Sequence, residues 1–284
     1  MQIEILGSGG ALATPRAGCA CRICVEARAK GIPYARSGPS TFIHGPDILF
    51  DTPEESREQL VRAGVARVAA CFYSHWHPDH VMGRRVWESL NVDVRGWTAA
   101  RTTDVYLPEQ VAIDFRRTLG TMDHLAFLEH QGVIRIIELR DGEQVTVGDV
   151  RVTPFRLAET YVYAFLVEDE ARRVLIAPDE LHNWSPPAHL AGLDLAVLPM
   201  GIVEIDPFTG ERRLEATHPL LAEEATFSQT IELARALDAR RIIFSHIEES
   251  DGLGHDDLGL LAERLRADGL PATFAYDTMG IDLA

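Results

Sequence analysis

The sequence has little cationic charge and no long apolar run, and each shortage excludes a class of protein. Lys and Arg number 27 against 43 Asp and Glu, and this net charge of −16 argues against broad binding of nucleic acid, which needs clustered cations. No stretch of about 18 apolar residues without charge appears, so we expect no membrane span. The start, MQIEILGSGG, lacks the basic segment and apolar core of a secretory signal, which favours a cytoplasmic protein.

Cysteine is also scarce, but three of the four cysteines lie within six residues. Cys19, Cys21 and Cys24 form the pattern Cys-x-Cys-x-x-Cys, while Cys71 lies in an apolar stretch typical of core. In a chain without an export signal, such a cluster favours a metal over a disulfide. Three thiols can bind one structural zinc, which needs a fourth ligand. The alternative is three reduced structural cysteines in a loop.

The order of apolar runs, turns and amphipathic stretches predicts an α/β protein. A single layered domain over 1–284, with helices outside two sheets, fits this order. We expect a Cys-rich loop at about 18–25 and a less regular insert at about 91–131. Strands are predicted at 1–6, 40–44, 47–51, 68–73, 104–107, 132–138, 144–148, 150–157, 161–168, 173–177, 194–199, 241–245, 272–275 and 280–283, and helices at 53–64, 79–90, from about 108, 223–237 and 256–268.

The segment His75-Trp76-His77-Pro78-Asp79-His80 directly follows the apolar stretch 68–73. On an extended backbone His75 and His77 face the same way, and Asp79 and His80 come after a proline, where the chain turns. Imidazole and carboxylate suit zinc, manganese or iron, so the segment can offer two ligands to one metal and two to another. A His-rich surface loop does not account for this spacing.

HxHxDH after a strand resembles the signature of the metallo-β-lactamase superfamily, and the likeness in order and spacing covers nearly the whole chain. The resemblance implies a four-layer αββα sandwich with metals at one edge. It also implies that Asp179 is a bridging ligand and His246 the last His ligand. Asp51 resembles an early Asp of the family that supports the site from behind without binding metal.

One position departs from the family pattern. The resemblance leads us to expect a metal-binding His within 154–160, and Glu159 is the best counterpart there. A carboxylate can bind metal, but it is a harder ligand than imidazole and adds negative charge. The first metal site is therefore either altered, favouring manganese or iron, or weak. The alternative for Glu159 is an exposed loop acid.

The cysteine cluster resembles that of a narrower branch of the superfamily. This branch includes the cyclic-phosphate phosphodiesterase of phosphonate degradation, and the accessory protein of pyrroloquinoline quinone biosynthesis carries a similar cluster. In the phosphodiesterase the fourth zinc ligand is a His three residues after the last active-site His. Here that position is Glu249, and either Glu249 or nearby His255 is the expected fourth ligand.

A second resemblance concerns the proton donor. Glu224-Ala225-Thr226-Phe227 opens a predicted helix and resembles the His-x-Thr-Phe box of the superfamily's phosphodiesterases, in which the His assists the leaving phosphate. Glu224 stands in place of that His. His218, six residues earlier, is a further candidate for a catalytic role, with an ordinary loop His as the alternative.

The resemblance implies a hydrolase with two divalent metal ions, zinc or manganese, beside one structural zinc. Such a cation lowers the pKa of its water from about 15.7 to about 7, and the hydroxide attacks the substrate. Metal ligands are expected at His75, His77, Asp79, His80, Glu159, Asp179 and His246, with Asp79 also orienting the hydroxide. The expected substrate is a small phosphodiester or cyclic phosphate.

Two other functions stay open at this point. A non-catalytic metal-binding protein, related to the quinone-pathway accessory, fits the three positions at which Glu replaces His. A lactone or ester hydrolase shares the metals but not the substrate, and fold does not decide between them. The sequence leaves open whether the chain forms a homodimer.

Overall fold

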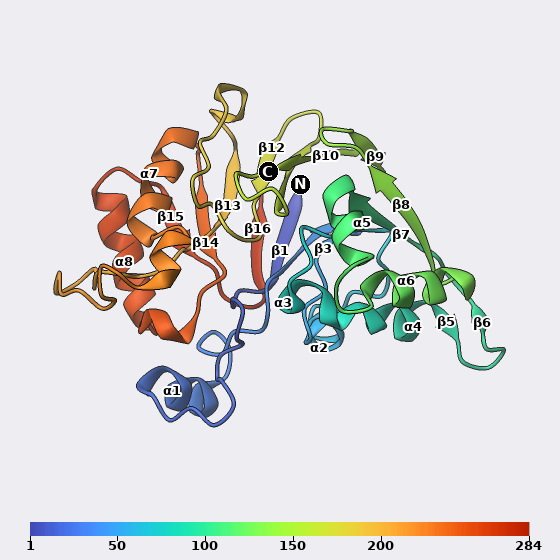
Figure 1. Ribbon diagram of the computed structural model, residues 1–284, viewed down its shortest axis with the longest axis horizontal. Helices are drawn as coiled ribbons and strands as arrows, with labels where there is room; N and C mark the ends of the chain where they lie inside the picture. Colours follow the sequence, from blue (N-terminus) through green and yellow to red (C-terminus); the bar gives the residue numbers. More distant parts are fainter. Residues whose placement is uncertain (284) are drawn as a thin grey trace.

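Two seven-stranded sheets pack face to face in the computed structural model, which describes residues 1–283 (Figure 1). The first sheet has the order β16-β1-β2-β3-β4-β7-β8, and the second has the order β15-β14-β13-β12-β11-β10-β9. The first is built from β1 (Gln2–Gly7), β2 (Ser40–His44), β3 (Ile48–Phe50), β4 (Ala70–Phe72), β7 (Thr103–Pro108), β8 (Ile134–Leu139) and β16 (Met279–Asp282). The second is built from β9 (Val145–Val147), β10 (Val150–Arg156), β11 (Tyr163–Glu168), β12 (Arg173–Ile176), β13 (Leu195–Pro199), β14 (Ile242–Ser245) and β15 (Ala272–Phe274).

Helices cover the outer face of each sheet, which gives the four layers of an αββα sandwich. The first sheet is flanked by α2 (Ser56–Arg62), α3 (Pro78–Val81), α4 (Val86–Asn91), α5 (Glu109–Phe115) and α6 (Thr121–His130). The second sheet is flanked by α7 (Phe227–Leu237) and α8 (His255–Ala267), while α1 (Arg22–Lys30) lies apart from both helix layers. Among the described residues, no helix has the length and apolarity needed to cross a membrane.

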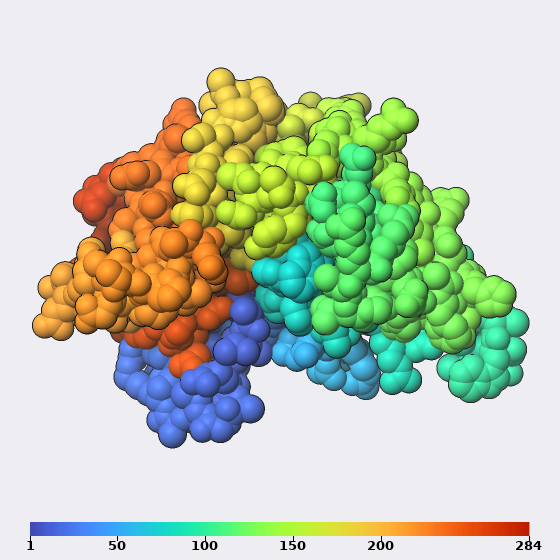
Figure 2. Space-filling view, in the orientation of Figure 1, coloured from blue at the N-terminus to red at the C-terminus, as the bar shows by residue number. Residues whose placement is uncertain are grey.

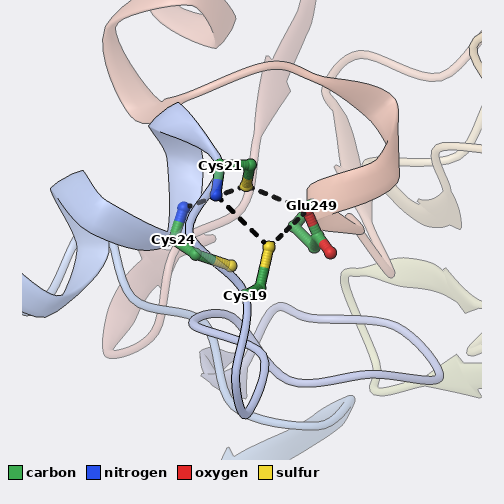
Figure 3. Close-up of side chains that lie close together, drawn as sticks. All are labelled: Cys19, Cys21, Cys24 and Glu249. Carbon is green, nitrogen blue, oxygen red and sulfur yellow. Dashed lines mark hydrogen bonds between the residues drawn. The ribbon is translucent and has the colours of Figure 1, made fainter.

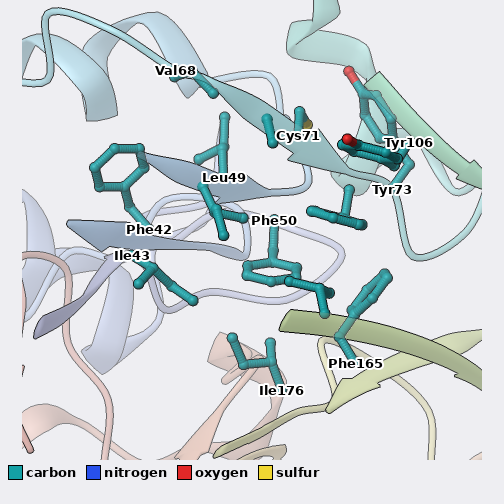
Figure 4. Packing of buried hydrophobic residues seen from close by; sticks show 14 of the residues in the cluster. Phe42, Ile43, Leu49, Phe50, Val68, Cys71, Tyr73, Tyr106, Phe165 and Ile176 are labelled. Atoms are coloured by element: carbon teal, nitrogen blue, oxygen red, sulfur yellow. The ribbon is translucent and has the colours of Figure 1, made fainter. Parts of the chain in front are cut away.

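The main core lies between the sheets, where side chains from both inner faces meet (Figure 4). Phe50 and Phe72 of the first sheet pack against Phe165 of the second, with ring centroids 5.0 and 5.7 Å from that of Phe165. Alternation along each strand sends every second side chain into this layer. A second cluster fills the space between the second sheet and α7 and α8. The two sheets are therefore held in a fixed relation.

Each sheet contains a run of four adjacent strands that are parallel to one another. β3, β4, β7 and β8 run the same way in the first sheet, and β12 to β15 do so in the second. Because the carboxyl ends of parallel strands meet at one edge, the loops that follow them gather there. That edge carries the residues that the sequence singled out.

The predicted fold class is confirmed, and two predictions about local structure need correction. The stretch 91–131 is not a less regular insert: it holds the short strands β5 (Val92–Asp93) and β6 (Thr98–Ala99), the internal strand β7, and helices α5 and α6. The Cys-rich segment is a loop only as far as Cys21, which caps α1, because its sulfur accepts the N–H of Cys24. Cys24 itself lies on the helix.

Candidate metal centre

Three segments that follow parallel strands bring six His and Asp side chains together. The segment after β4, which includes α3, carries four of them, the loop after β12 carries one, and the loop after β14 carries one. They form two groups whose ligand atoms lie within 4.8 Å of one another. The first group is His75, His77 and Asp179, and the second is Asp79, His80 and His246.

Asp179 lies between the two groups. Its Oδ2 is 3.2 Å from Nε2 of His75 and 4.0 Å from Nδ1 of His77. The same oxygen is 3.7 Å from Nε2 of His80, while its Oδ1 is 3.4 Å from Nε2 of His246. One carboxylate thus faces ligand atoms of both groups, which is the arrangement a bridging ligand requires.

Asp79 holds the second group together. Its Oδ2 lies 3.1 Å from Nε2 of His80 and 3.5 Å from Nε2 of His246. His80 and His246 come from opposite sheets, yet their rings stack with centroids 5.7 Å apart. The second group therefore spans the interface between the two halves of the sandwich.

The ring nitrogens of the site fit a metal better than they fit hydrogen bonding. The Nε2 atoms of His75, His80 and His246 are buried and have no hydrogen-bond partner among the described residues. A buried nitrogen left in this way costs free energy on the order of 1–3 kcal/mol, unless a ligand occupies it. Nitrogen with carboxylate oxygen is a donor set that zinc and manganese accept.

Hydrogen bonds behind the rings fix their orientation. Asp51 follows β3 and is fully buried; its Oδ2 lies 2.8 Å from Nδ1 of His80. The same carboxylate accepts the N–H and the hydroxyl of Ser74, at 2.8 and 2.6 Å. The Ser74 hydroxyl lies 3.0 Å from Nδ1 of His75. Nδ1 of each ring is thus occupied, which directs Nε2 of both rings into the site.

Two residues of the site have left-handed backbone conformations. Asp51 has φ of 61° and His246 has φ of 53°. Such conformations are uncommon outside glycine and recur where the surrounding structure fixes a functional side chain. Gly10 contributes to the same packing, because a Cβ there would lie 2.8 Å from Nδ1 of His246.

The charges of the site are strongly coupled. Burial alone would raise the pKa values of the Asp79 and Asp179 carboxyls, but the adjacent His rings outweigh it and hold both below the usual range. Burial, together with His75, lowers the pKa of His77 to about 4. Burial would also lower the pKa of His246, but Asp179 and Asp79 outweigh it and raise the pKa to about 9. Ionised carboxylates and a neutral His77 are the forms that bind cations.

The structure does not bring Glu159 into either group, which corrects its expected role. Its side chain is 36% exposed, and its Oε1 lies 3.9 Å from Nδ1 of His182. The loop that carries Glu159 instead presents Tyr161 to the site, with its ring centroid 5.4 Å from that of His77. Among the described residues, the first group therefore offers three side chains that could bind a metal.

A cavity of about 500 Å³ adjoins the two groups, and Asp179 and His246 form part of its wall. Glu224 and His218 also line it, so the structure brings both predicted catalytic residues to the same space. Burial, together with Asp179 and Glu248, raises the pKa of Glu224 to about 7. Figure 2 shows one face on which segments from the start of the chain (blue), near residue 80 (cyan) and near residue 220 (orange) border one another.

The three clustered cysteines meet Glu249 at a separate place (Figure 3). The Sγ atoms of Cys21 and Cys19 lie 3.1 and 3.8 Å from Oε2 of Glu249. All four ligand atoms, that of Cys24 included, lie within 4.8 Å of one another. His255 is not part of this group and packs instead against Tyr34, with ring centroids 5.3 Å apart.

Backbone N–H groups donate hydrogen bonds to all three sulfurs. Cys21 N–H donates to Sγ of Cys19, Cys24 N–H to Sγ of Cys21, and Arg16 N–H to Sγ of Cys24, at 3.2 to 3.4 Å. The hydrogen bond from Cys21 is the main cause that lowers the pKa of Cys19. Three thiols and one carboxylate form a set that can hold one zinc. The other oxygen of Glu249 pairs with Nε of Arg16 at 2.5 Å.

Sequence reasoning missed several residues of the site. Ser74 precedes the HxHxDH segment, and Glu180 and Glu248 neighbour Asp179 and His246, so proximity along the chain was the available signal. Glu180 and Glu248 line the cavity, and burial, together with Asp179, raises the pKa of Glu180 to about 7. Asp251 also lines it, through a turn that no sequence motif indicates.

A family model and a protein of known name are similar to this chain in sequence. Residues 45–247 match the model of a β-lactamase superfamily domain. A ribonuclease Z from Archaeoglobus fulgidus is 25% identical over 215 residues, which cover 72% of this chain and 67% of that protein.

Solved structures share the fold over the whole chain. A diphosphatase of the PhnP family superposes with a TM-score of 0.70 and 21% identity, covering 100% of this chain and 98% of the other. The Zn²⁺-bound PqqB of Methylobacterium extorquens also gives a TM-score of 0.70, with 18% identity and complete coverage of both chains. The matched domain takes in all six clustered His and Asp side chains. The chain belongs to the metallo-β-lactamase superfamily.

Proposed function

We propose that this protein is a metal-dependent hydrolase that cleaves a small phosphodiester or cyclic phosphate. The proposal rests mainly on the buried Nε2 atoms of His75, His80 and His246, which form no hydrogen bond with the described residues. They lie with Asp79 and Asp179 at one edge of the sandwich. A cavity of about 500 Å³ adjoins them and can admit a small substrate. A ligand set and a cavity side by side are what a hydrolytic site needs.

The two His and Asp groups would each hold one divalent cation. His75 and His77 belong to one site, Asp79, His80 and His246 to the other, and Asp179 lies between them. When bound, such cations lower the pKa of water and neutralise charge on phosphoryl oxygens. The ionised Asp79 carboxylate accepts a hydrogen bond from the attacking water and so orients it.

Proton delivery to the leaving oxygen falls to the residues that line the cavity. Burial, together with Asp179 and Glu248, raises the pKa of Glu224, which favours the protonated form that a proton donor needs. His218 accepts the N–H of Leu220 at Nδ1, which leaves Nε2 for contact with a ligand. The relatives named diphosphatase and ribonuclease Z act on bonds to phosphorus, and this likeness supports the same choice of substrate here.

The test combines metal counting with turnover. The protein is stripped with a chelator, reloaded with zinc or manganese, and assayed with bis(p-nitrophenyl) phosphate, a 2′,3′-cyclic nucleotide and a simple lactone. We expect two ions beside the cysteine-bound zinc and turnover of the phosphodiesters. Turnover of the lactone alone would identify an ester hydrolase. A protein that binds two ions and turns over none of these substrates would be a metal-binding accessory protein.

A further inference from the structure

Tyr161 lies in the turn between β10 and β11 and brings a phenol to the first His and Asp group. The centroid of its ring is 5.4 Å from that of His77 and 6.1 Å from that of His75. Both imidazoles belong to the side chains that could bind a metal there. The phenol therefore lies directly beside a candidate cation site, although it is not one of the clustered ligands.

Backbone hydrogen bonds fix the turn that carries Tyr161. Val162 N–H donates to the carbonyl of Glu159 at 3.0 Å, which closes the turn. Tyr163 N–H donates to the carbonyl of Ser74 at 3.1 Å, which ties the start of β11 to the residue before the HxHxDH segment. The hairpin and the metal segment are thus held in a fixed relation, and the phenol has a defined place in the site.

The hydroxyl of Tyr161 makes no hydrogen bond among the residues that the structure describes, although the side chain is partly buried. The other tyrosine of this hairpin differs, because the hydroxyl of Tyr163 donates to Asp141 and accepts the Nε–H of Arg156. A buried phenol usually finds a hydrogen-bond partner. The O–H of Tyr161 is therefore available to a ligand.

The surroundings of the phenol favour its protonated form. Burial, followed by Asp179 and three further carboxylates, raises the pKa of Tyr161 to about 12. The effect of Asp179 also indicates that the hydroxyl lies on the side of the ring that faces the metal groups. At neutral pH the side chain thus offers one O–H donor, which matches the acceptor oxygens of a phosphoryl group.

The first group leaves a coordination position for a substrate oxygen. It offers three candidate ligands among the described residues, namely His75, His77 and Asp179. A catalytic zinc takes three protein ligands and keeps a fourth position for water or substrate. An oxygen in that position would lie beside the imidazoles against which Tyr161 packs.

We propose that Tyr161 is a catalytic residue whose O–H donates a hydrogen bond to a non-bridging oxygen of the phosphodiester at the first group. This inference rests on the proposed function and adds a residue to it. Such a donor accelerates the reaction because the hydrogen bond strengthens as negative charge gathers on that oxygen in the transition state. Tyr161 keeps its proton throughout, so its role differs from that of Glu224.

The test removes the hydroxyl and keeps the ring. Tyr161→Phe and the parent protein are loaded with zinc or manganese and assayed with bis(p-nitrophenyl) phosphate. We expect kcat to fall roughly 100-fold, with a much smaller change in KM, because the bond is strongest in the transition state. The number of bound ions should stay the same, since the inference does not make the phenol a metal ligand.

Binding of orthovanadate provides a readout that does not depend on turnover. This anion adopts the five-coordinate geometry of the transition state, and its affinity should fall about tenfold in Tyr161→Phe. Tyr276→Phe is the matched control. Tyr276 is also partly buried and also packs against a His ring, that of His255, at 5.8 Å, but it belongs to neither metal group. This control should match the parent in kcat and in orthovanadate affinity.

Failure of the inference and failure of the proposed function give different results. Loss of one bound ion from Tyr161→Phe would make the phenol a metal ligand and overturn the hydrogen-bonding role. Unchanged kcat and unchanged orthovanadate affinity would overturn it too, as would equal losses in Tyr276→Phe. In each of these cases the parent protein remains active. Absence of phosphodiester turnover by the parent with two ions bound overturns the proposed function, together with the catalytic role that rests on it.

Discussion

The Asp51 carboxylate and the His80 ring form a buried pair, with Oδ2 of Asp51 lying 2.8 Å from Nδ1 of His80. Neither side chain is exposed, and the carboxylate also accepts two hydrogen bonds from Ser74. A carboxylate at Nδ1 keeps the proton on that nitrogen and leaves the Nε2 lone pair free for a metal. Asp51 thus acts on the site through His80.

Asp51→Asn should weaken metal binding without unfolding the chain. Asn tolerates the left-handed conformation at this position, but it presents an N–H to either Ser74 or His80, both of which need an acceptor. Loss of such a supporting partner costs roughly 10–100-fold in metal affinity. A competition titration with a chelating dye measures the change. Asp149→Asn, at an exposed turn, is the matched control and should bind metal normally.

His77→Ala should abolish turnover and remove the metal of the first group. That group offers three candidate ligands among the described residues, so the variant leaves only His75 and Asp179. Elemental analysis should show about one fewer ion per chain, and phosphodiester turnover should fall to background. His130→Ala, at an exposed position near the end of α6, provides the comparison. Full activity in the His77 variant would exclude the metal mechanism.

If the cysteine cluster holds a zinc as proposed, Glu249→Ala should release it. Without the carboxylate only three thiols remain, and α1 loses its link to the loop that follows β14. We expect zinc content to fall by about one ion and Tm to fall by roughly 5 °C. Arg16→Ala removes the ion pair to Glu249 but no ligand, so it should retain the zinc. Equal zinc content in both variants would show that Glu249 is not a ligand.

Turnover of esters with poor leaving groups should fall as pH rises through the pKa of Glu224. The protonated form donates, and burial with Asp179 raises this pKa to about 7. Bound cations favour the ionised form, so the basic limb of kcat/KM should lie at or below pH 7. Glu224→Gln should remove the limb and lower the rate for an alkyl leaving group by roughly 100-fold. The rate for a nitrophenyl leaving group should change little; an equal loss for both would exclude proton donation.

The sequence allowed prediction of the parts that depend on short motifs and strand periodicity. Residues 75–80 follow a buried strand and contain three His and one Asp, so both their position and their role in metal binding could be predicted. Asp179 and His246 required the family likeness, because only the fold shows that β12 and β14 end at the same edge as β4. Glu249 required it too, since nothing near the cysteines in sequence points to a residue more than two hundred positions away.

Other features depend on tertiary packing that no local pattern encodes. Glu159 looked suited to metal binding by its position before β11, but the turn presents Tyr161 to the site and leaves Glu159 partly exposed beside His182. Helix α1 has weak local signals, because its N-cap is a cysteine and it carries no acidic residue in its first turn. The acidic wall of the cavity joins three loops, so it becomes visible only when the loops are placed in space.

The rings of His80 and His246 stack, although the two residues follow strands of opposite sheets. A cation bound by both rings would therefore link the two halves of the sandwich. Neither half has a complete set of ligands by itself. Ion binding and docking of the halves are therefore thermodynamically linked, and free ion at a hundred times its Kd would add about 2.7 kcal/mol to the resistance to unfolding. The concentration of free metal would then affect the stability of the folded protein as well as its rate of turnover.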